Sequence, residues 1–122
     1  MIPTPQSKPY DLEERTFQFA QRVRALVKRL PRTLSNWEDG KQLVRASGSV
    51  GANYIEANES LGTKDFLMRI KISRKEARES RFWLRLLDLE GRSELEPERT
   101  ELLQESIELT RILSAIHNKR SG

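Results

Sequence analysis

The chain has 122 residues, 33% of them charged, a mean hydropathy of −0.69 and a net charge of +4. These values predict one soluble domain and leave no apolar run near the roughly 20 residues that a membrane-spanning helix needs. The absence of cysteine excludes disulfides, thiolate nucleophiles and cysteine-ligated metals, and we expect a cytoplasmic protein. Residues 1–9 hold three prolines and no apolar segment, which predicts a flexible tail, not a signal peptide, before a domain over 10–119.

Capping signals predict where the first two helices begin. Asp11 and Glu14 form a capping-box pattern in front of an apolar stripe, so the first helix begins near Asp11, and Pro31 ends it. Ser35 and Glu38 repeat the pattern. The second helix is therefore expected from about residue 35 to residue 60, where a Leu-Gly pair stops it.

Two further helices complete the chain. Thr63 is expected to cap a helix over 64–90 that ends at Gly91, and Pro97 suits the first turn of a helix that continues to about residue 119. No segment alternates in polarity long enough to predict a strand, and every connection is short. The sequence therefore predicts an all-α fold, an up-down-up-down antiparallel four-helix bundle.

The middle of the second helix is rich in small residues. Residues 46–52 read Ala-Ser-Gly-Ser-Val-Gly-Ala, and Gly48 and Gly51 each lower helix propensity by about 1 kcal/mol relative to Ala. Apolar and small residues continue in register on both sides, which predicts a helix packed closely on a neighbour. A flexible loop is the alternative. Asn53 lies on the same stripe, where we expect a buried, hydrogen-bonded amide that fixes helix register.

The third helix is apolar on two faces. The first face is a seam with alternating spacings of three and four residues, typical of a helix that packs on a core. It comprises Phe66, Ile70, Ser73, Ala77, Ser80, Leu84 and Leu87. A second strip, roughly opposite, comprises Met68, Ile72, Trp83 and Leu86, with Phe82 and Leu89 close by. Because a monomeric bundle needs only the first seam, the strip predicts an interface with another copy.

Charges near these helices extend the predicted interface. Arg45 and Glu56 share the opposite face of the second helix, too far apart to pair with each other. We expect them to meet charges on the third helix or on a neighbouring subunit. Glu76 and Glu79 are candidate partners for the arginines, and Glu76 is expected to be a structural polar residue, since an unpaired carboxylate near a core is costly.

Basic residues form two lines along the helices. Steps of three and four residues place Lys71, Arg74, Arg78, Arg81 and Arg85 on one flank of the third helix. Arg15, Arg22 and Arg29 follow one another seven residues apart on the first helix. Such lines can follow the phosphates of a nucleic acid, and without a base-recognition motif the contacts would depend on shape and backbone. The alternative is a solvated, salt-bridged surface, with Glu76 and Glu79 as partners.

The sequence offers little support for catalysis. Di-metal bundles use paired Glu-x-x-His motifs, whereas His117 is the only histidine. No nucleophile has an evident activating base. The glycines of the second helix are followed by no Lys-Ser or Lys-Thr pair, so a phosphate-binding loop is excluded. We therefore expect no enzyme activity, no metal and no cofactor.

Several segments resemble a known family. They are Tyr10–Glu13, Phe19–Ala20, Leu30–Pro31, Gln42–Ala46, Ser49–Ala57, Lys64–Phe66, Lys75–Glu79 and Trp83–Leu87. Together they resemble the bacterial four-helix bundle proteins encoded in intervening sequences of 23S ribosomal RNA genes. The resemblance implies a homopentameric ring with a basic surface available to nucleic acid. The segment Phe82–Leu87 is also similar to the Avd accessory proteins of diversity-generating retroelements, which bind a reverse transcriptase and its template RNA.

The resulting hypothesis is a bundle that assembles into a ring-shaped homo-oligomer, a pentamer by resemblance, and acts as a non-catalytic RNA-associated scaffold. A second hypothesis is an accessory subunit of a reverse transcriptase that holds template RNA on the same basic flank. The third is a protein-only scaffold, in which these arginines pair with the glutamates of the fourth helix of the next subunit.

Overall fold

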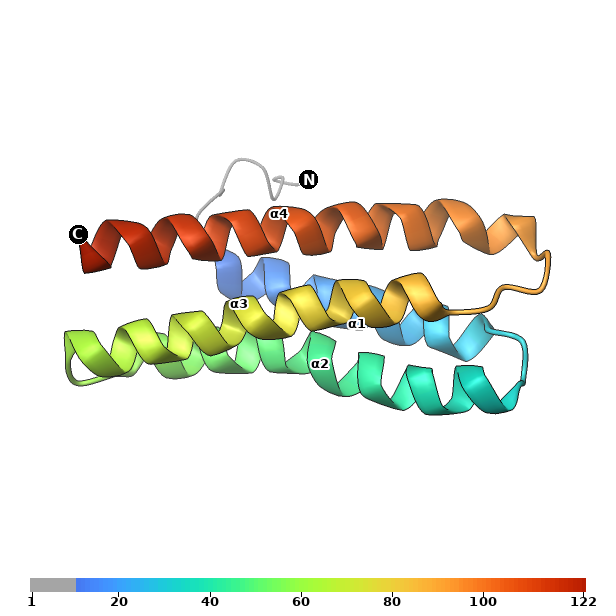
Figure 1. The fold of residues 1–122 in the computed structure, drawn as a ribbon, viewed down its shortest axis with the longest axis horizontal. Helices are drawn as coiled ribbons and strands as arrows, with labels where there is room; N and C mark the ends of the chain where they lie inside the picture. Colours follow the sequence, from blue (N-terminus) through green and yellow to red (C-terminus); the bar gives the residue numbers. More distant parts are fainter. Residues whose placement is uncertain (1–10) are drawn as a thin grey trace.

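The computed structural model describes residues 11–122, so the predicted tail over 1–9 lies outside the described residues. Its elements are α1 (Leu12–Arg29), α2 (Leu34–Asn58), α3 (Thr63–Leu86), a 3₁₀ turn η2 (Ser93–Leu95) and α4 (Glu96–Ser121). Figure 1 shows the four helices side by side, each running opposite to the one before it in the chain. The described part contains no strand, and the predicted all-α, antiparallel bundle is confirmed.

The helix starts follow from capping side chains, with one shift from the prediction. Asp11 Oδ1 accepts a hydrogen bond from the Glu14 backbone N–H at 3.2 Å, as expected for the start of α1. For α2 the predicted Ser35 cap is wrong. Thr33 has extended backbone angles, its hydroxyl accepts from the Asn36 N–H at 3.1 Å, and the helix begins at Leu34. At α3 the cap is Gly62, one residue before the predicted Thr63.

The end of α3 differs most from the prediction. The helix stops at Leu86, four residues before the expected Glu90, although the apolar pattern continues. The buried Asn36 side chain receives the Asp88 N–H at 2.9 Å and donates to the Asp88 carbonyl at 2.8 Å, in place of helical hydrogen bonds. The chain then turns at Glu90 and Gly91, whose φ values are 50° and 77°. Leu89 therefore lies buried in this connection and not on the predicted outer strip.

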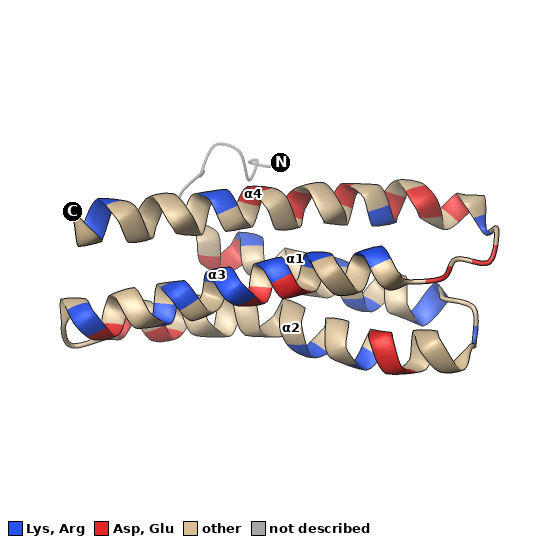
Figure 2. Cartoon of the chain, viewed as in Figure 1, with Lys and Arg blue, Asp and Glu red and all other residues tan. Residues whose placement is uncertain are grey.

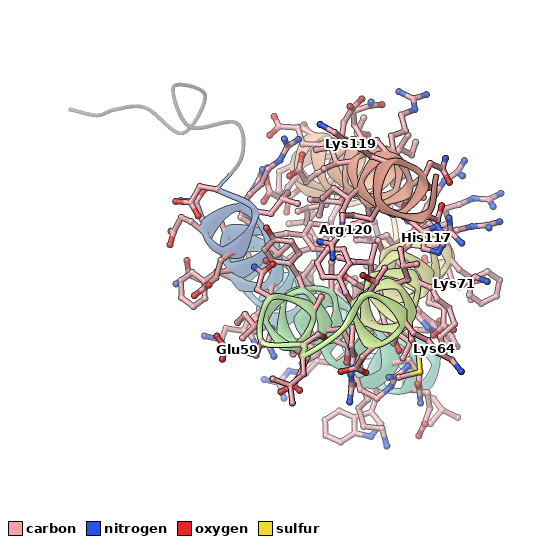
Figure 3. All side chains as sticks on the ribbon, turned by 90° about the vertical axis from the view of Figure 1, so that its left-hand side faces the viewer. Glu59, Lys64, Lys71, His117, Lys119 and Arg120 are labelled. Carbon is pink, nitrogen blue, oxygen red and sulfur yellow. The ribbon has the colours of Figure 1, made fainter. Side chains whose placement is uncertain are left out.

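The core runs along the inside of all four helices. Its largest fully buried side chains include Phe19 of α1, Leu43 of α2, Ile70 of α3 and Leu109 of α4. The predicted seam on α3 is buried, except that Phe66 is half-buried under the Arg120 guanidinium, 4.0 Å from the ring centroid. Viewed end-on, α1 and α3 lie on opposite sides of the bundle (Figure 3). The outer surface of α3 is therefore remote from α1.

The small residues of α2 are helical, so the predicted helix is confirmed and the loop alternative is wrong. Gly51 lies against α1, where an added Cβ would be 2.7 Å from Thr16 Oγ1. That hydroxyl is fixed, because it donates to the Leu12 carbonyl at 2.7 Å. At Gly48 an added Cβ would meet only the flexible end of Arg24, at 3.4 Å. Close approach of two helices thus explains Gly51 but not Gly48.

The two glycines predict opposite stability changes. We expect Gly51→Ala to destabilise the protein by about 1 kcal/mol, because overpacking costs roughly 1–3 kcal/mol and the gain in helix propensity returns only about 1 kcal/mol. Gly48→Ala is the matched control and should stabilise by about 0.5–1 kcal/mol. Urea unfolding followed by circular dichroism measures both. Equal stabilisation by the two substitutions would contradict the close helix contact at Gly51.

Candidate nucleic-acid interface

The basic residues predicted on α3 form one continuous surface. This surface, the α3 basic flank, comprises Lys71, Arg74, Arg78, Arg81 and Arg85. It extends for about 21 Å at 1.5 Å per residue. All five are exposed except Arg74, which is half-buried and donates to Ser114 Oγ of α4 at 3.5 Å. Figure 2 shows basic segments recurring along the α3 ribbon, and Figure 3 places Lys71 on the side of α3 that faces away from α1.

The α3 basic flank is free of ion pairs. Among the described residues no carboxylate oxygen lies within 4.0 Å of its five side-chain cations. The two glutamates expected as partners point elsewhere. Arg45 Nη1 lies 3.6 Å from Glu76 Oε1 and its Nη2 lies 3.4 Å from Glu79 Oε1, while Lys75 Nζ lies 3.7 Å from Glu79 Oε2. The salt-bridged alternative therefore does not describe this flank.

Glu76 and Asn53 occupy the inner side of these contacts. Glu76 is 6% exposed, and its Oε1 accepts no hydrogen bond, so the nearby Arg45 charge is its main compensation. Asn53 is half-buried and donates to the Ser49 carbonyl at 2.9 Å, while its Oδ1 accepts from Arg69 Nη1 at 3.2 Å. Asn53 therefore links α2 to α3, consistent with the predicted register role. Glu56 is exposed and has no carboxylate-cation contact within 4.0 Å in the described part.

The line of arginines on α1 has a different role from the predicted one. Arg15 donates to Glu105 of α4 through Nε at 2.6 Å and Nη2 at 2.9 Å. Arg22 donates to Glu98 at 3.0 and 2.9 Å and to Glu101 at 2.7 Å. The hydrogen bonds that Arg15 donates to Glu105 and Arg22 donates to Glu98 raise the pKa of both arginines above the usual range. The seven-residue spacing thus places both arginines along α4, and we remove them from the nucleic-acid surface.

The raised pKa values of Arg15 and Arg22 do not make the stability of the protein depend on pH near neutrality. A base whose pKa is raised on folding contributes stability below its unfolded pKa and loses it only as pH rises through the folded value. For arginine both the unfolded and the folded pKa lie far above neutral pH, so the two ion pairs keep their full contribution to stability there. Arg29, the third residue of the line, is exposed and has no carboxylate partner within 4.0 Å among the described residues.

Arg22→Gln tests the intramolecular role of this arginine. We expect a loss of about 0.5–1 kcal/mol in the free energy of unfolding, because the pair is partly exposed and screened by solvent. The loss should shrink as salt rises. Arg24→Gln is the control, since Arg24 is exposed on the same helix and its side chain donates a hydrogen bond to the Ala20 carbonyl but, among the described residues, forms no ion pair. Chemical unfolding at low and high salt measures the effect. If Arg22→Gln lowers RNA affinity and leaves stability unchanged, Arg22 belongs to the nucleic-acid surface after all.

The remaining glutamates of α4 form ion pairs within the chain as well. Figure 2 shows acidic segments concentrated in the half of α4 that follows η2. Besides the partners of Arg15 and Arg22, Glu96 pairs with Arg99 at 3.1 Å and Glu108 with Arg111 at 3.2 Å. All five glutamates of α4 are therefore engaged within the chain. This removes the main support for a protein-only scaffold in which they pair with arginines of the next subunit.

The second apolar strip predicted on α3 is present, but some of its residues differ from the predicted ones. Met68, Phe82 and Leu86 each expose about half of their surface, whereas Ile72 is half-buried. Trp83 is half-buried against the core and meets the Phe82 ring edge-to-face, with centroids 5.1 Å apart. The outer strip therefore comprises Met68, Ile72, Phe82 and Leu86. Its middle is crossed by the Lys75–Glu79 ion pair.

A second apolar surface was not predicted. Phe17 of α1 and Ile55 of α2 are exposed and line one groove with Ala20 and Ala52. Neither helix carries a second apolar strip by itself, so periodicity along one helix at a time does not reveal the groove. It lies on α1 and α2, whereas the outer strip lies on α3, across the bundle from α1.

Two kinds of site are not found in the described part of the chain. No group of three or more His, Cys, Asp and Glu side chains is placed to hold a metal ion among residues 11–122. No helix of this range is long and apolar enough to cross a membrane.

Fold and surface together define an antiparallel four-helix bundle with an unpaired basic flank. The chain belongs to the 23S rRNA-intervening sequence protein family, whose model matches residues 9–115. A crystal structure of a protein with unknown function from the S23 ribosomal protein family of Bacteroides thetaiotaomicron is similar, with a TM-score of 0.72 and 27% identity. The similarity covers 86% of this chain and 96% of that chain. None of the curated proteins matches.

Proposed function

We propose that this protein is a non-catalytic RNA-associated scaffold whose α3 basic flank contacts phosphates. One observation carries the proposal: five side-chain cations line one helix face, and no carboxylate among the described residues neutralises them. Glu76 and Glu79 lie on the same helix, but they pair with Arg45 and Lys75 and leave the flank without a carboxylate partner. A stripe of free cations attracts a polyanion and releases its counterions on binding.

The flank favours backbone contacts over base recognition. Arginines at steps of three and four residues point to one side of α3, where they can meet successive phosphates. No aromatic side chain belongs to the flank, and no helix of the described part has a known base-reading motif. The family's description refers to the intervening sequences of 23S rRNA, and we take RNA as the polyanion to test first.

Assembly into a ring is the second part of the proposal. The outer strip of α3 and the Phe17–Ile55 groove are different surfaces, since the groove lies between α1 and α2, and α1 is on the opposite side of the bundle from α3. A contact between two different surfaces is heterologous, and it closes into a ring when the rotation between copies allows. A ring would bring several α3 basic flanks together, which would increase RNA affinity through multivalency.

A binding titration tests the proposed function. Fluorescence anisotropy of a labelled single-stranded RNA, with duplex DNA in parallel, should show binding at low salt, and light scattering should give a mass several times the 14.2 kDa of one chain. No binding to either nucleic acid at low salt would overturn the RNA-associated role. A monomeric mass with binding retained would overturn only the ring.

A further inference from the structure

One further groove belongs neither to the α3 basic flank nor to the two apolar surfaces assigned to the ring. It lies where the end of α1 meets the first turns of α2. Val27 and Val44, both half-buried, line it together with Gly40, whose Cα lies so close to α1 that an added Cβ would be 3.4 Å from Val27 Cγ1. The groove therefore presents a small apolar floor.

Trp37 borders this groove without packing on the core. It is 66% exposed, and the Lys41 ammonium lies above its ring, with Nζ 5.9 Å from the ring centroid. An indole in this position leaves a large flat apolar face in water. A single exposed aromatic residue is common on protein surfaces, so the charges around it decide its interpretation.

The charged residues that line the groove are all basic. It includes Lys28, Arg32, Lys41 and Arg45, and no aspartate or glutamate. Lys28 and Arg32 have no carboxylate oxygen within 4.0 Å among the described residues, while Lys41 has only the weak contact of 3.6 Å with exposed Glu38. Lys28 and Arg32 also line an adjoining hollow, which adds Arg29, Arg92 and a single carboxylate, Glu94. The surface around the indole is thus complementary to an anion that also carries a flat apolar group.

We propose that this groove binds one nucleobase of a single-stranded nucleic acid, stacked on the Trp37 indole, with the flanking phosphates held by Lys28, Arg32 and Lys41. Stacking on an aromatic ring beside a basic surface is the usual way in which proteins hold single strands without reading their sequence. The proposal rests on the proposed function but uses a different surface. The α3 basic flank supplies charge alone, whereas this groove discriminates bases from bare phosphates.

The test compares two probes that differ only in their bases. An oligothymidylate of about eight nucleotides, within the usual range of site sizes, is titrated beside an abasic strand of the same length. Intrinsic fluorescence should be quenched by the thymidylate and not by the abasic strand. Trp37→Phe should abolish this quenching, which assigns it to Trp37 and not to Trp83. Trp37→Ala should weaken thymidylate binding about 5- to 100-fold and leave abasic binding unchanged.

Leu34→Ala is the matched control, since Leu34 is 78% exposed in the same turn and does not line the groove. It should bind like the wild type. If the wild type binds oligothymidylate without quenching, and Trp37→Ala binds it equally well, the groove proposal is overturned while the proposed function stands. The groove proposal also fails if polyglutamate displaces the labelled thymidylate as effectively as unlabelled thymidylate does. If the wild type binds no strand at low salt, both proposals fail.

Discussion

Reversing two charges of the α3 basic flank, Arg78→Glu with Arg85→Glu, is expected to weaken RNA binding about 100-fold without changing the mass of the assembly. Both side chains are exposed and have no carboxylate partner within 4.0 Å among the described residues, so their loss disturbs no contact of the fold. A charge-assisted contact contributes roughly 1.5–3 kcal/mol, and losing two of them at the lower end of this range, as suits exposed side chains, accounts for a factor of this size. Anisotropy with a labelled single-stranded RNA measures the change.

The control must separate a local contact from the overall charge. Arg111→Glu with Lys119→Glu removes the same four charge units as the flank variant, and both take the protein from +4 to about neutral. Arg111 and Lys119 are exposed on α4 and line neither the α3 outer strip nor the Phe17–Ile55 groove. We expect a loss below about fivefold for this control, since only the long-range attraction is reduced. Equal losses in the two double variants would show that net charge, and not the flank, determines binding.

Charging the outer strip of α3 is expected to dissociate the assembly. Met68→Glu with Phe82→Glu places two carboxylates on a surface that we assign to the contact between copies, where desolvating an unpaired charge is costly. Both residues are about half exposed, so the monomer tolerates the change and its helix content stays the same. Ile72 and Trp83 suit this test less, since both are half-buried and Trp83 packs on the core. Light scattering should report 14.2 kDa.

Leu61→Glu serves as the control for the strip. Leu61 is fully exposed in the connection between α2 and α3 and belongs to neither apolar surface, so its substitution should leave the mass unchanged. If the strip variant keeps the mass of the wild type, the assignment of the strip as a subunit contact is wrong. If both variants become monomeric, the contact surface includes the α2–α3 connection.

Local periodicity was sufficient to predict the helices and most of the core. Ile70, Ser73, Ala77 and Leu84 recur every three or four residues, and all four are buried as that spacing requires. The family resemblance was confirmed by the match over 9–115. Spacing works here because each helix of a bundle buries one stripe, which is visible within the helix itself.

Contacts between distant residues account for what the sequence did not reveal. The apolar pattern of α3 runs past Leu86, but Asn36, 52 residues before Asp88 in the chain, binds that residue and ends the helix early. Similarly, Arg22 and Arg78 look alike as members of basic lines. Only the packing of α1 beside α4, which brings Glu98 to Arg22, distinguishes the neutralised arginine from the free one.

The two apolar surfaces illustrate the same limit. The strip on α3 was predictable because one helix carries it, although spacing alone did not show that Trp83 turns towards the core and Phe82 towards water. The groove between Phe17 and Ile55 exists only because α1 and α2 lie together. A surface made by two helices requires the tertiary fold for its prediction.

The most direct test of the central claim is the salt dependence of wild-type binding to a single-stranded RNA. Each phosphate contact contributes about −0.7 to the slope of log affinity against log salt. If the five cations of the α3 basic flank contact phosphates, the slope should be about −3.5 or steeper, since a ring would add contacts from other copies. A slope shallower than about −1, or no binding at about 50 mM salt, would contradict the proposed phosphate contacts.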